Sequence, residues 1–419
     1  MRCTIVAIGP RGDIQPMIAL GRGLARAGVT VRCATHADFA ASAAAHGLEV
    51  VEVQGRADRF FGGAAGVAVR ERLADARAFR RFFDDYLSLF YQRLLDEVTE
   101  ACRDADLVVC WPWTRFATTL AEALGVPVVI ACPYPPMHLP TAAFANPFQR
   151  ETPPGTPSPA SNRRSWRLAL PALQAGDAVL ARRRRALGLS PISWRADLRR
   201  LRGLPHLLGY SAAVLPRPAD WPPDVHVTGF WFLDDADRYG PPAALAGFLD
   251  AGPAPVAIGF SSQSARDAAA NTRVVREAVA RAGVRAVVLQ GFGGVGAGDD
   301  DDQMVTLPSA PHDWLYPRVA AVVHHGGSGS TGAALRAGVP SMAVPFGYDQ
   351  PLWGARLHAL GVGPAPIPAD ELSVDRLAAA LTALTTDQTM RARARQMAGV
   401  IRAEDGVTRA VDAVLALRG

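Results

Sequence analysis

The chain has 419 residues, of which 49% are hydrophobic and 20% are charged, and its formal net charge is +5 at pH 7. These values exclude a disordered protein and a coiled coil, and the length favours two or three domains. All 44 basic residues are arginine, which excludes enzymes that need a Schiff-base or phosphate-loop lysine. A chain without lysine also indicates a high-GC genome, such as an actinobacterial one.

Several other classes of protein are excluded by pattern. No apolar run approaches the ~18 residues of a membrane span, and Arg11 and Asp13 interrupt the amino terminus, which is therefore a poor secretory signal. We accordingly expect a cytoplasmic protein with no transmembrane segment. The run Arg183 to Arg185 has no interleaved aromatic residues, which indicates a solvated helix face and no nucleic-acid binding. The five cysteines lack a Cys-x-x-Cys spacing, so neither zinc nor disulfides are expected.

Apolar runs alternate with helical patterns along the first half of the chain. Strands are predicted at 3–9, 29–34, 48–53, 107–111 and 126–132, and helices at 16–27, 37–45 and 79–102. The continuous apolar runs indicate a parallel sheet that is covered by helices on both faces. A proline-rich stretch from 133 to 159 then predicts a long loop, which is a candidate lid.

The second half repeats this alternation after proline-rich segments between 216 and 242. Strands are predicted at 256–259, 286–290, 304–307, 319–323 and 341–344, with helices between them and from 373 to the end. The simplest architecture is α/β, with two Rossmann-like halves that bind ligand in the cleft between them. We expect a first domain at 1–215, a linker at 216–254, a second domain at 255–400 and a helix at 401–419 that could cross back to the first domain.

The strongest local motif is His324-His325-Gly326-Gly327-Ser328-Gly329-Ser330-Thr331, which directly follows a predicted strand and opens a helix. Glycines let the backbone approach a ligand, and a helix start presents unpaired N–H groups and the positive end of the dipole. These features predict a phosphate or diphosphate site with His325 as a donor. His324 is expected to be packed inside. The alternative is a glycine-rich turn with a serine cap.

A second polar pair, Asp349-Gln350, also follows an apolar strand. A neighbouring carboxylate and amide can bind vicinal hydroxyls of a sugar, although such a pair is also an ordinary helix start. Two other motifs are decoys. The G-x-G-x-x-G match at 291–296 has no helix after it, which argues against a dinucleotide site, and the aspartates at 299–302 indicate a solvated loop and not a metal site.

Three segments together resemble a known signature. Pro311-His312-Asp313-Trp314-Leu315, the loop at 324–331 and Asp349-Gln350-Pro351-Leu352-Trp353-Gly354 resemble the donor-binding signature of inverting GT-B family 1, UDP-glycosyltransferase-like enzymes. Gly9-Pro10-Arg11-Gly12-Asp13-Ile14-Gln15-Pro16 and Thr228-Gly229-Phe230-Trp231 resemble the bacterial natural-product, sterol and glycopeptide-antibiotic branches. The likeness is specific from 305 to 365 and weak from about 55 to 230.

This resemblance implies roles for individual residues. Asp13 becomes the candidate general base, although capping of a helix that begins near Gln15 would also explain it. The implied donor-binding residues are Arg11, Gly12, Ser262, His312, Trp314, His325, Gly327, Ser328, Ser330, Thr331, Asp349 and Gln350. A solvated role for Arg11 is an equal alternative. The implied co-substrate is a UDP- or dTDP-hexose, with no other cofactor and no metal.

The resemblance also places the acceptor, a hydroxyl-bearing hydrophobic small molecule, in the first half. Candidate wall residues there are aromatic, and each of them singly is better explained as core than as a ligand contact: Trp111, Trp113, Tyr134, Phe144, Phe148 and the stretch from Phe82 to Tyr91, which includes Tyr86. We therefore expect an inverting glycosyltransferase that acts as a monomer or homodimer in antibiotic or other secondary metabolism. The alternatives are a nucleotide-sugar 2-epimerase-like enzyme of the same shape and a non-catalytic auxiliary protein.

Overall fold

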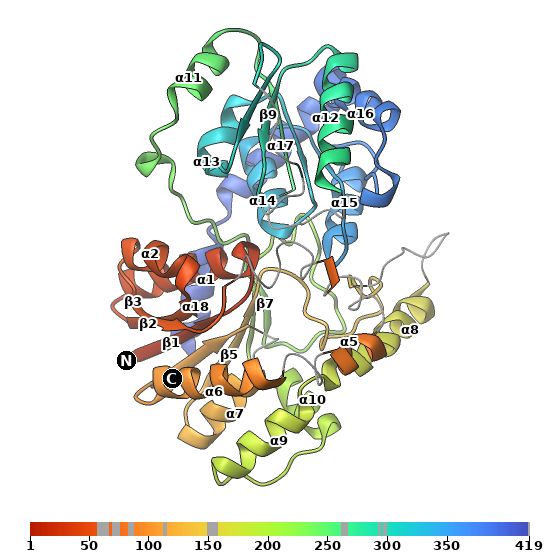
Figure 1. Ribbon diagram of the computed structural model, residues 1–419. Coiled ribbons are helices and arrows are strands. Elements are labelled where there is room, and N and C mark those ends of the chain that lie inside the picture. Colours follow the sequence, from red (N-terminus) through yellow and green to blue (C-terminus); the bar gives the residue numbers. More distant parts are fainter. Residues whose placement is uncertain are drawn as a thin grey trace.

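The computed structural model describes residues 1–56, 67–68, 76–82, 88–111, 115–148, 158–260, 267–291, 295 and 300–417. Two α/β domains lie one above the other in Figure 1, with the first half of the chain in the lower domain and most of the second half in the upper one. Among the described residues, none of the helices combines the length and the apolar character needed to cross a membrane.

The first domain is built on a parallel sheet of seven strands in the order β3-β2-β1-β4-β5-β6-β7. The strands are β1 Arg2–Ala7, β2 Thr30–His36, β3 Glu49–Val53, β4 Leu107–Cys110, β5 Val128–Cys132, β6 His206–Leu208 and β7 Val225–Val227. Its α-helices are α1 Arg11–Arg26, α2 Ala37–Ala45, α5 Ala76–Phe82, α6 Ser88–Cys102, α7 Arg115–Leu124, α8 Pro159–Ala169, α9 Asp177–Ala186 and α10 Trp194–Arg202. Strand β1 lies between β2 and β4, and its Cys3 pairs with Val31 on one side and with Leu107 on the other.

The second domain repeats this order in a parallel sheet of five strands, β10-β9-β8-β11-β12. The strands are β8 Val256–Gly259, β9 Ala286–Leu289, β10 Met304–Leu307, β11 Ala321–His324 and β12 Ser341–Ala343. Its helices are α11 Ala243–Asp250, α12 Ala268–Ala282, α13 His312–Leu315, α14 Ser328–Ala337, α15 Gln350–Ala359, α16 Val374–Thr386 and α17 Gln388–Ala403, and the chain then continues into α18 Gly406–Ala416. In both sheets the order of the strands reverses beside the first strand, between β1 and β4 and between β8 and β11. Doubly wound folds bind their ligands at this point.

Sequence analysis missed two strands and misplaced one helix start. Strands β6 and β7 have three residues each, too few to show a period of two, and β7 lies inside the expected linker although it pairs with β6. Helix α1 begins at Arg11, five residues before the predicted start at 16. Proline is favoured in a first helical turn, but here Pro16 lies inside α1, and the missing N–H is tolerated there.

The last helix, α18, returns to the first domain. It packs on α1, and Ala410, Val411 and Val414 belong to the same hydrophobic core as the residues under β1 and β2. In Figure 1, α18 accordingly lies in the lower domain beside α1. The two helices approach closely because Gly23 has no side chain; a Cβ there would lie 2.4 Å from Cγ1 of Val407.

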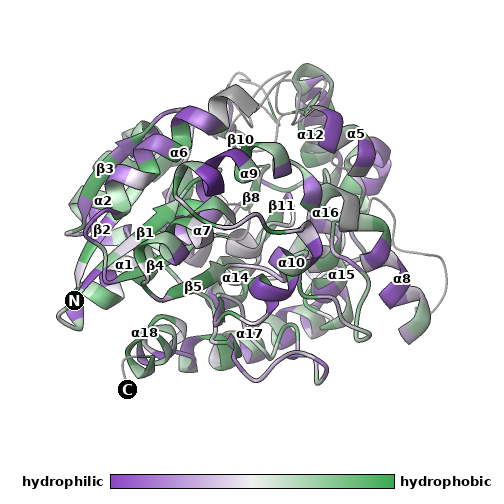
Figure 2. Cartoon of the chain, turned by 90° about the horizontal axis from the view of Figure 1, so that it is seen from below, coloured by the Kyte–Doolittle hydropathy of each residue, from purple (hydrophilic) through white to green (hydrophobic). Residues whose placement is uncertain are grey.

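Burial distinguishes the strands from the outer helices. Viewed from below, the strands of the first sheet are mainly hydrophobic, whereas the covering helices carry polar outer faces (Figure 2). Strands β4 and β9 are buried at every residue, as expected for parallel strands with helices on both faces.

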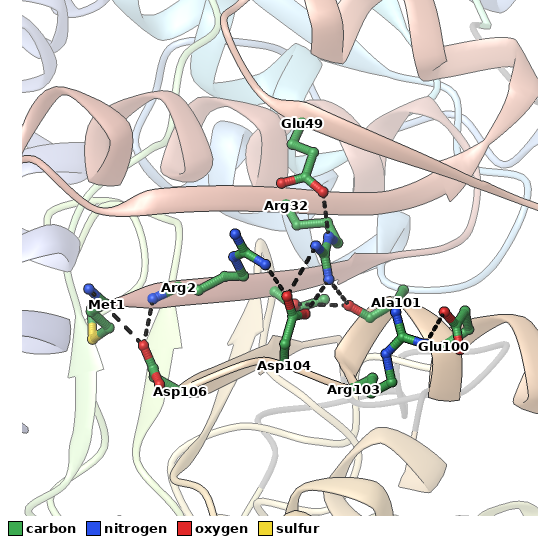
Figure 3. Close-up of polar contacts among 10 residues, drawn as sticks. Met1, Arg2, Arg32, Glu49, Glu100, Ala101, Arg103, Asp104 and Asp106 are labelled. Carbon is green, nitrogen blue, oxygen red and sulfur yellow. Dashed lines mark hydrogen bonds and ion pairs between the residues drawn. The ribbon is translucent and has the colours of Figure 1, made fainter.

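Charged side chains form contacts near the amino ends of the strands of the first sheet (Figure 3). The Arg32 guanidinium contacts Glu49 at 2.7 Å and Asp104 at 2.5 Å, and the backbone N–H of Arg2 donates to Asp106 at 2.7 Å. Glu49 and Asp104 are largely solvent-exposed, so these pairs add little stability. The carboxyl ends of the strands carry the residues considered next.

Candidate active site at the domain boundary

The predicted anion loop lies between β11 and α14. Gly326 has φ +90°, and its N–H donates to Nδ1 of the buried His324 at 2.9 Å, which holds His324 inside as expected. Gly327 is the residue before α14, and no side chain caps the helix. The N–H groups of the first turn therefore lack partners within the helix and are oriented for an anion.

His325 lies over the glycine of this loop. A Cβ on Gly327 would be 2.4 Å from Nε2 of His325, so only glycine leaves room for the imidazole. The imidazole is buried, and its Nδ1 has no hydrogen-bond partner among the described residues. Burial, aided by His312, lowers the pKa of His325 to about 3. The neutral ring therefore holds one N–H to donate, and it would gain charge only beside an anion.

His312 and Arg11 come together from opposite domains. The His312 ring stacks on Tyr316, with 4.4 Å between ring centroids. Burial, aided by the nearby Arg11 guanidinium, lowers the pKa of His312 to about 4. Arg11 is itself exposed at the start of α1, which contacts α14 across the domain boundary. Arg11 is thus exposed to solvent and also lies near His312.

Trp314 lies at the outer side of this group. Tyr239, from the segment that joins the domains, meets its ring edge-on at 5.1 Å, and the Arg318 guanidinium lies 4.4 Å from its centroid. The neighbouring Asp313 accepts hydrogen bonds from the backbone N–H groups of Asp235 and Ala236. The start of α13 is therefore fixed to the connecting segment, and this contact positions Trp314.

Asp349 and Gln350 are buried at the start of α15. The indole N–H of Trp353 donates to Oδ2 of Asp349 at 2.6 Å, and Oε1 of Gln350 accepts from the backbone N–H of Phe346 at 2.7 Å. Burial raises the pKa of Asp349 to about 6. Tyr348, just before it, has φ +57°, a conformation that is strained for a residue with a side chain and that clusters at functional sites.

Asp13 lies in the first turn of α1, where the helix dipole favours a carboxylate. Burial raises the pKa of Asp13 well above its ordinary value of 3.8, and the charge of Asp349 raises it further. The Tyr134 phenol is hydrogen-bonded to the Asp13 carboxylate and lowers this pKa. Capping does not explain Asp13: α1 begins at Arg11, Pro10 is the cap position, and no side chain caps the helix.

Two hydroxyls of the anion loop have roles that the sequence did not indicate. The Ser328 hydroxyl donates to the carbonyl of Pro133 in the other domain at 2.6 Å, and Ser330 is hydrogen-bonded to the Tyr316 phenol. Only Thr331, fully buried, has a hydroxyl without a partner among the described residues. The expectation that these hydroxyls serve an anion together therefore needs refinement, because Ser328 also joins the domains.

Tyr134, which contacts Asp13, belongs to a cluster of aromatic residues in the first domain. Tyr134 meets Trp111 edge-on with 6.5 Å between centroids and Phe148 at 5.7 Å, while Phe144 contacts Trp221 at 6.1 Å. Sequence analysis named Phe148 among the candidate wall residues but did not name Trp221. The signal of Trp221 was weak, because it lies in the expected linker.

Some expected site residues lie outside the described residues. These are Ser262, Trp113 and Tyr86, together with the side chain of Phe82 and most of the glycine-rich segment 291–296. Of the acidic run at 299–302, Asp301 contacts Arg276 at 2.6 Å and Asp300 accepts a backbone N–H from Thr306. Among the described residues, no three histidine, cysteine or acidic side chains are grouped so that they could hold a metal ion.

Two parallel-sheet domains, with a helix start that no side chain caps at their boundary, correspond to a GT-B architecture. The family model described as "Glycosyltransferase family 28 N-terminal domain" matches residues 3–138, and "Erythromycin biosynthesis protein CIII-like, C-terminal domain" matches 302–417. A crystal structure of the glycotransferase of kitacinnamycin matches with a TM-score of 0.69 at 19% identity, over 99% of this chain and 97% of that chain.

Curated relatives extend the match to the full chain. The Arabidopsis thaliana sterol 3-beta-glucosyltransferases UGT80A2 and UGT80B1 are 34% and 31% identical over 99% of this chain. The chain belongs to the GT-B family 1 glycosyltransferases, and sterol 3-beta-glucosyltransferases are among its relatives. It spans 65% of the length of UGT80A2 and 67% of that of UGT80B1, and about 30% of a fungal relative from Emericella nidulans.

Proposed function

We propose that the protein is an inverting glycosyltransferase that moves a hexose or deoxyhexose from a UDP- or dTDP-sugar to a hydroxyl of a hydrophobic small molecule. One observation carries this proposal. Asp13 of the first domain and Asp349 of the second are both buried at the domain boundary, close enough for the charge of one to raise the pKa of the other. A candidate base thus lies beside a candidate sugar-binding carboxylate.

The reaction is a direct displacement at the anomeric carbon. The acceptor hydroxyl gives its proton to Asp13 while its oxygen bonds to that carbon. The bond from the carbon to the diphosphate oxygen breaks, and its electron pair leaves with the nucleoside diphosphate. His325 and the first-turn N–H groups of α14 bind the charge that develops there. Inversion follows, so an α-linked D-sugar donor yields a β-linked product.

The hydrogen bonds of Asp349 and Gln350 support their proposed roles. Trp353 occupies Oδ2 of Asp349, which leaves Oδ1 to accept a sugar hydroxyl. The carbonyl oxygen of Gln350 already accepts from Phe346 and Gly347, so its amide nitrogen is the group that donates to the sugar. His312, Trp314, Arg11 and Gly12 are proposed to surround the nucleotide, with Ser262, Gly327, Ser330 and Thr331 near the diphosphate.

The acceptor is proposed to lie on the first-domain side, against Trp111, Phe144 and the aromatic residues beyond them. The names of the curated relatives favour a sterol or a similarly rigid polycyclic alcohol, whereas the CIII-like model favours a macrolide or another natural product. A lysine-free chain from a high-GC, actinobacterial genome would fit the second class. The five cysteines are free thiols in the described residues, which fits a reducing cytoplasm.

The test is transfer itself. The protein is incubated with UDP-glucose or dTDP-glucose and, separately, with cholesterol or a macrolide aglycone, and products are detected by mass spectrometry. A product heavier than the acceptor by one hexosyl group supports the proposal. Epimerisation of UDP-glucose or UDP-N-acetylglucosamine without transfer would support the 2-epimerase-like alternative, and donor binding without turnover would support an auxiliary protein. One chain supplies both sides of the site, so a monomer or a homodimer would suffice.

A further inference from the structure

Tyr134 is held in one orientation near the domain boundary. It lies two residues after β5, and its ring is buried between the edge-on contacts of Trp111 and Phe148. Its hydroxyl is hydrogen-bonded to the carboxylate of Asp13. Because the aromatic contacts restrict rotation of the ring, packing fixes the position of the hydroxyl oxygen, and the acceptor Asp13 then sets the direction of the O–H.

Gly9 leaves room for the Asp13 carboxylate close to its backbone. A Cβ on Gly9 would lie 3.0 Å from Oδ2 of Asp13, and Gly9 has φ +141°, so a side chain is excluded at this position. A phenol donates one hydrogen bond, and it can therefore engage one carboxylate oxygen while the other remains available as an acceptor. The hydrogen bond from Tyr134 thus orients the carboxylate in the space that Gly9 leaves.

The backbone next to Tyr134 is held by the second domain. The carbonyl of Pro133 accepts the hydroxyl proton of Ser328, from the first residue of α14. The same helix start is the proposed diphosphate site. Pro133 therefore contacts the anion loop of the second domain, and the next residue, Tyr134, contacts the candidate base Asp13.

We propose that Tyr134 is a positioning residue for the general base: its O–H fixes which oxygen of Asp13 faces the acceptor hydroxyl. This inference rests on the proposed function of Asp13, and it replaces the expected role of Tyr134 as part of the acceptor wall. The titratable groups that interact with Asp13 are Tyr134 and Cys132 at the end of β5 and Asp349 at the start of α15. Of these, Tyr134 alone stabilises the charged carboxylate.

The first experiment measures the carboxylate directly and needs no substrate. Carbon-13 NMR of aspartate-labelled protein, with the Asp13 signal assigned from Asp13→Asn, gives its titration midpoint in wild type and in Tyr134→Phe. Loss of the hydrogen bond raises the midpoint. The matched control is Tyr210→Phe, because Tyr210 is fully buried in the same core and its hydroxyl has no partner among the described residues. The control leaves the midpoint unchanged.

The second experiment measures kinetics with UDP-glucose and cholesterol. We expect Tyr134→Phe to lower kcat about tenfold while KM for either substrate changes less than about twofold, and the acid limb of the rate to move to higher pH. Tyr210→Phe keeps the wild-type profile. Replacement of Tyr134 by 3,5-difluorotyrosine preserves the ring, strengthens the O–H donor and moves the NMR midpoint to lower pH. This variant also serves if Tyr134→Phe does not fold.

The outcomes separate the two proposals. An unchanged midpoint in both Tyr134 variants overturns the hydrogen bond, and an unchanged kcat with a shifted midpoint overturns its importance for the reaction. If Asp13→Asn retains the wild-type rate, the proposed function of Asp13 fails. If Asp13→Asn is inactive while Tyr134→Phe behaves as wild type, only the positioning role fails.

Discussion

The hydroxyl of Ser328 donates a hydrogen bond of 2.6 Å to the backbone carbonyl of Pro133, which joins the anion loop of the second domain to the segment after β5 in the first. Both partners are buried, so the bond is not replaced by water when it is lost. The arrangement of the two domains around the site therefore depends partly on Ser328 of the anion loop.

Ser328→Ala is expected to weaken binding of UDP to the protein by about 3- to 10-fold, since a buried hydrogen bond contributes about 0.5–1.5 kcal/mol. Isothermal titration calorimetry measures this affinity. Ser373→Ala is the control, because Ser373 caps α16 away from the site and its loss reduces stability without affecting the loop. Equal affinities for wild type and Ser328→Ala would contradict a role for this contact in forming the donor site.

His325→Ala is expected to reduce UDP affinity at least about tenfold, because a hydrogen bond to a charged phosphate contributes about 1.5–3 kcal/mol. The pKa of His325 is about 3 in the ligand-free site, so the ring is neutral at pH 7 and binding of a diphosphate should draw a proton to it. Calorimetry in buffers with different ionisation enthalpies measures this uptake. Binding with neither loss of affinity nor proton uptake would overturn the assignment.

Asp349→Asn is expected to raise the melting temperature at pH 7.5 while it reduces activity. Burial raises the pKa of Asp349 from 3.8 to about 6, so the folded state loses stability as the pH rises from about 4 to about 6 and remains destabilised at higher pH. The shift corresponds to about 3 kcal/mol at most, and the advantage of asparagine should vanish near pH 4. Thermal melts of both proteins across pH measure the difference. If the difference in melting temperature between wild type and Asp349→Asn stays constant with pH, ionisation of Asp349 is not the cause of that difference.

Gly23→Ala is expected to destabilise the protein by about 1–3 kcal/mol, because its Cβ would overlap Val407 and separate α18 from α1. Gly399→Ala is the matched control: it also lies inside a helix, with open space around a Cβ, and should stabilise the protein by about 0.5–1 kcal/mol. Urea denaturation measures both. Equal effects of the two substitutions would contradict the close packing of α18 on the first domain.

Removal of divalent metal ions should leave the rate of transfer unchanged. The proposed diphosphate site consists of His325, hydroxyls and backbone N–H groups, which can bind the leaving charge without a cation. Rates with UDP-glucose are compared with and without EDTA, and then after magnesium is restored. A rate that falls with EDTA and recovers with magnesium would show that a cation takes part.

The sequence predicted the two parallel-sheet halves because continuous apolar runs that alternate with helical patterns indicate buried strands without reference to tertiary contacts. Strand β10 has the predicted bounds, and β8 does as well. Strands β6 and β7 could not be predicted, because three residues become a strand only when the neighbouring strand supplies partners.

The same distinction holds for the site. His325 and Asp349 lie in local motifs whose chemistry is visible from spacing alone. The contact of Tyr134 with Asp13, the domain bridge from Ser328 and the support of Asp349 by Trp353 depend on how separate segments meet in space. Sequence reasoning therefore found the groups that carry charge and missed most of the groups that orient them.

The rate at which Asp13→Asn transfers glucose from UDP-glucose to an accepted hydroxylated acceptor tests the central claim most directly. Asparagine keeps the size of the side chain but cannot take the acceptor's proton at neutral pH. The account predicts a loss of kcat of at least about 100-fold with UDP affinity nearly unchanged. A variant that transfers glucose at the wild-type rate would contradict Asp13 as the general base.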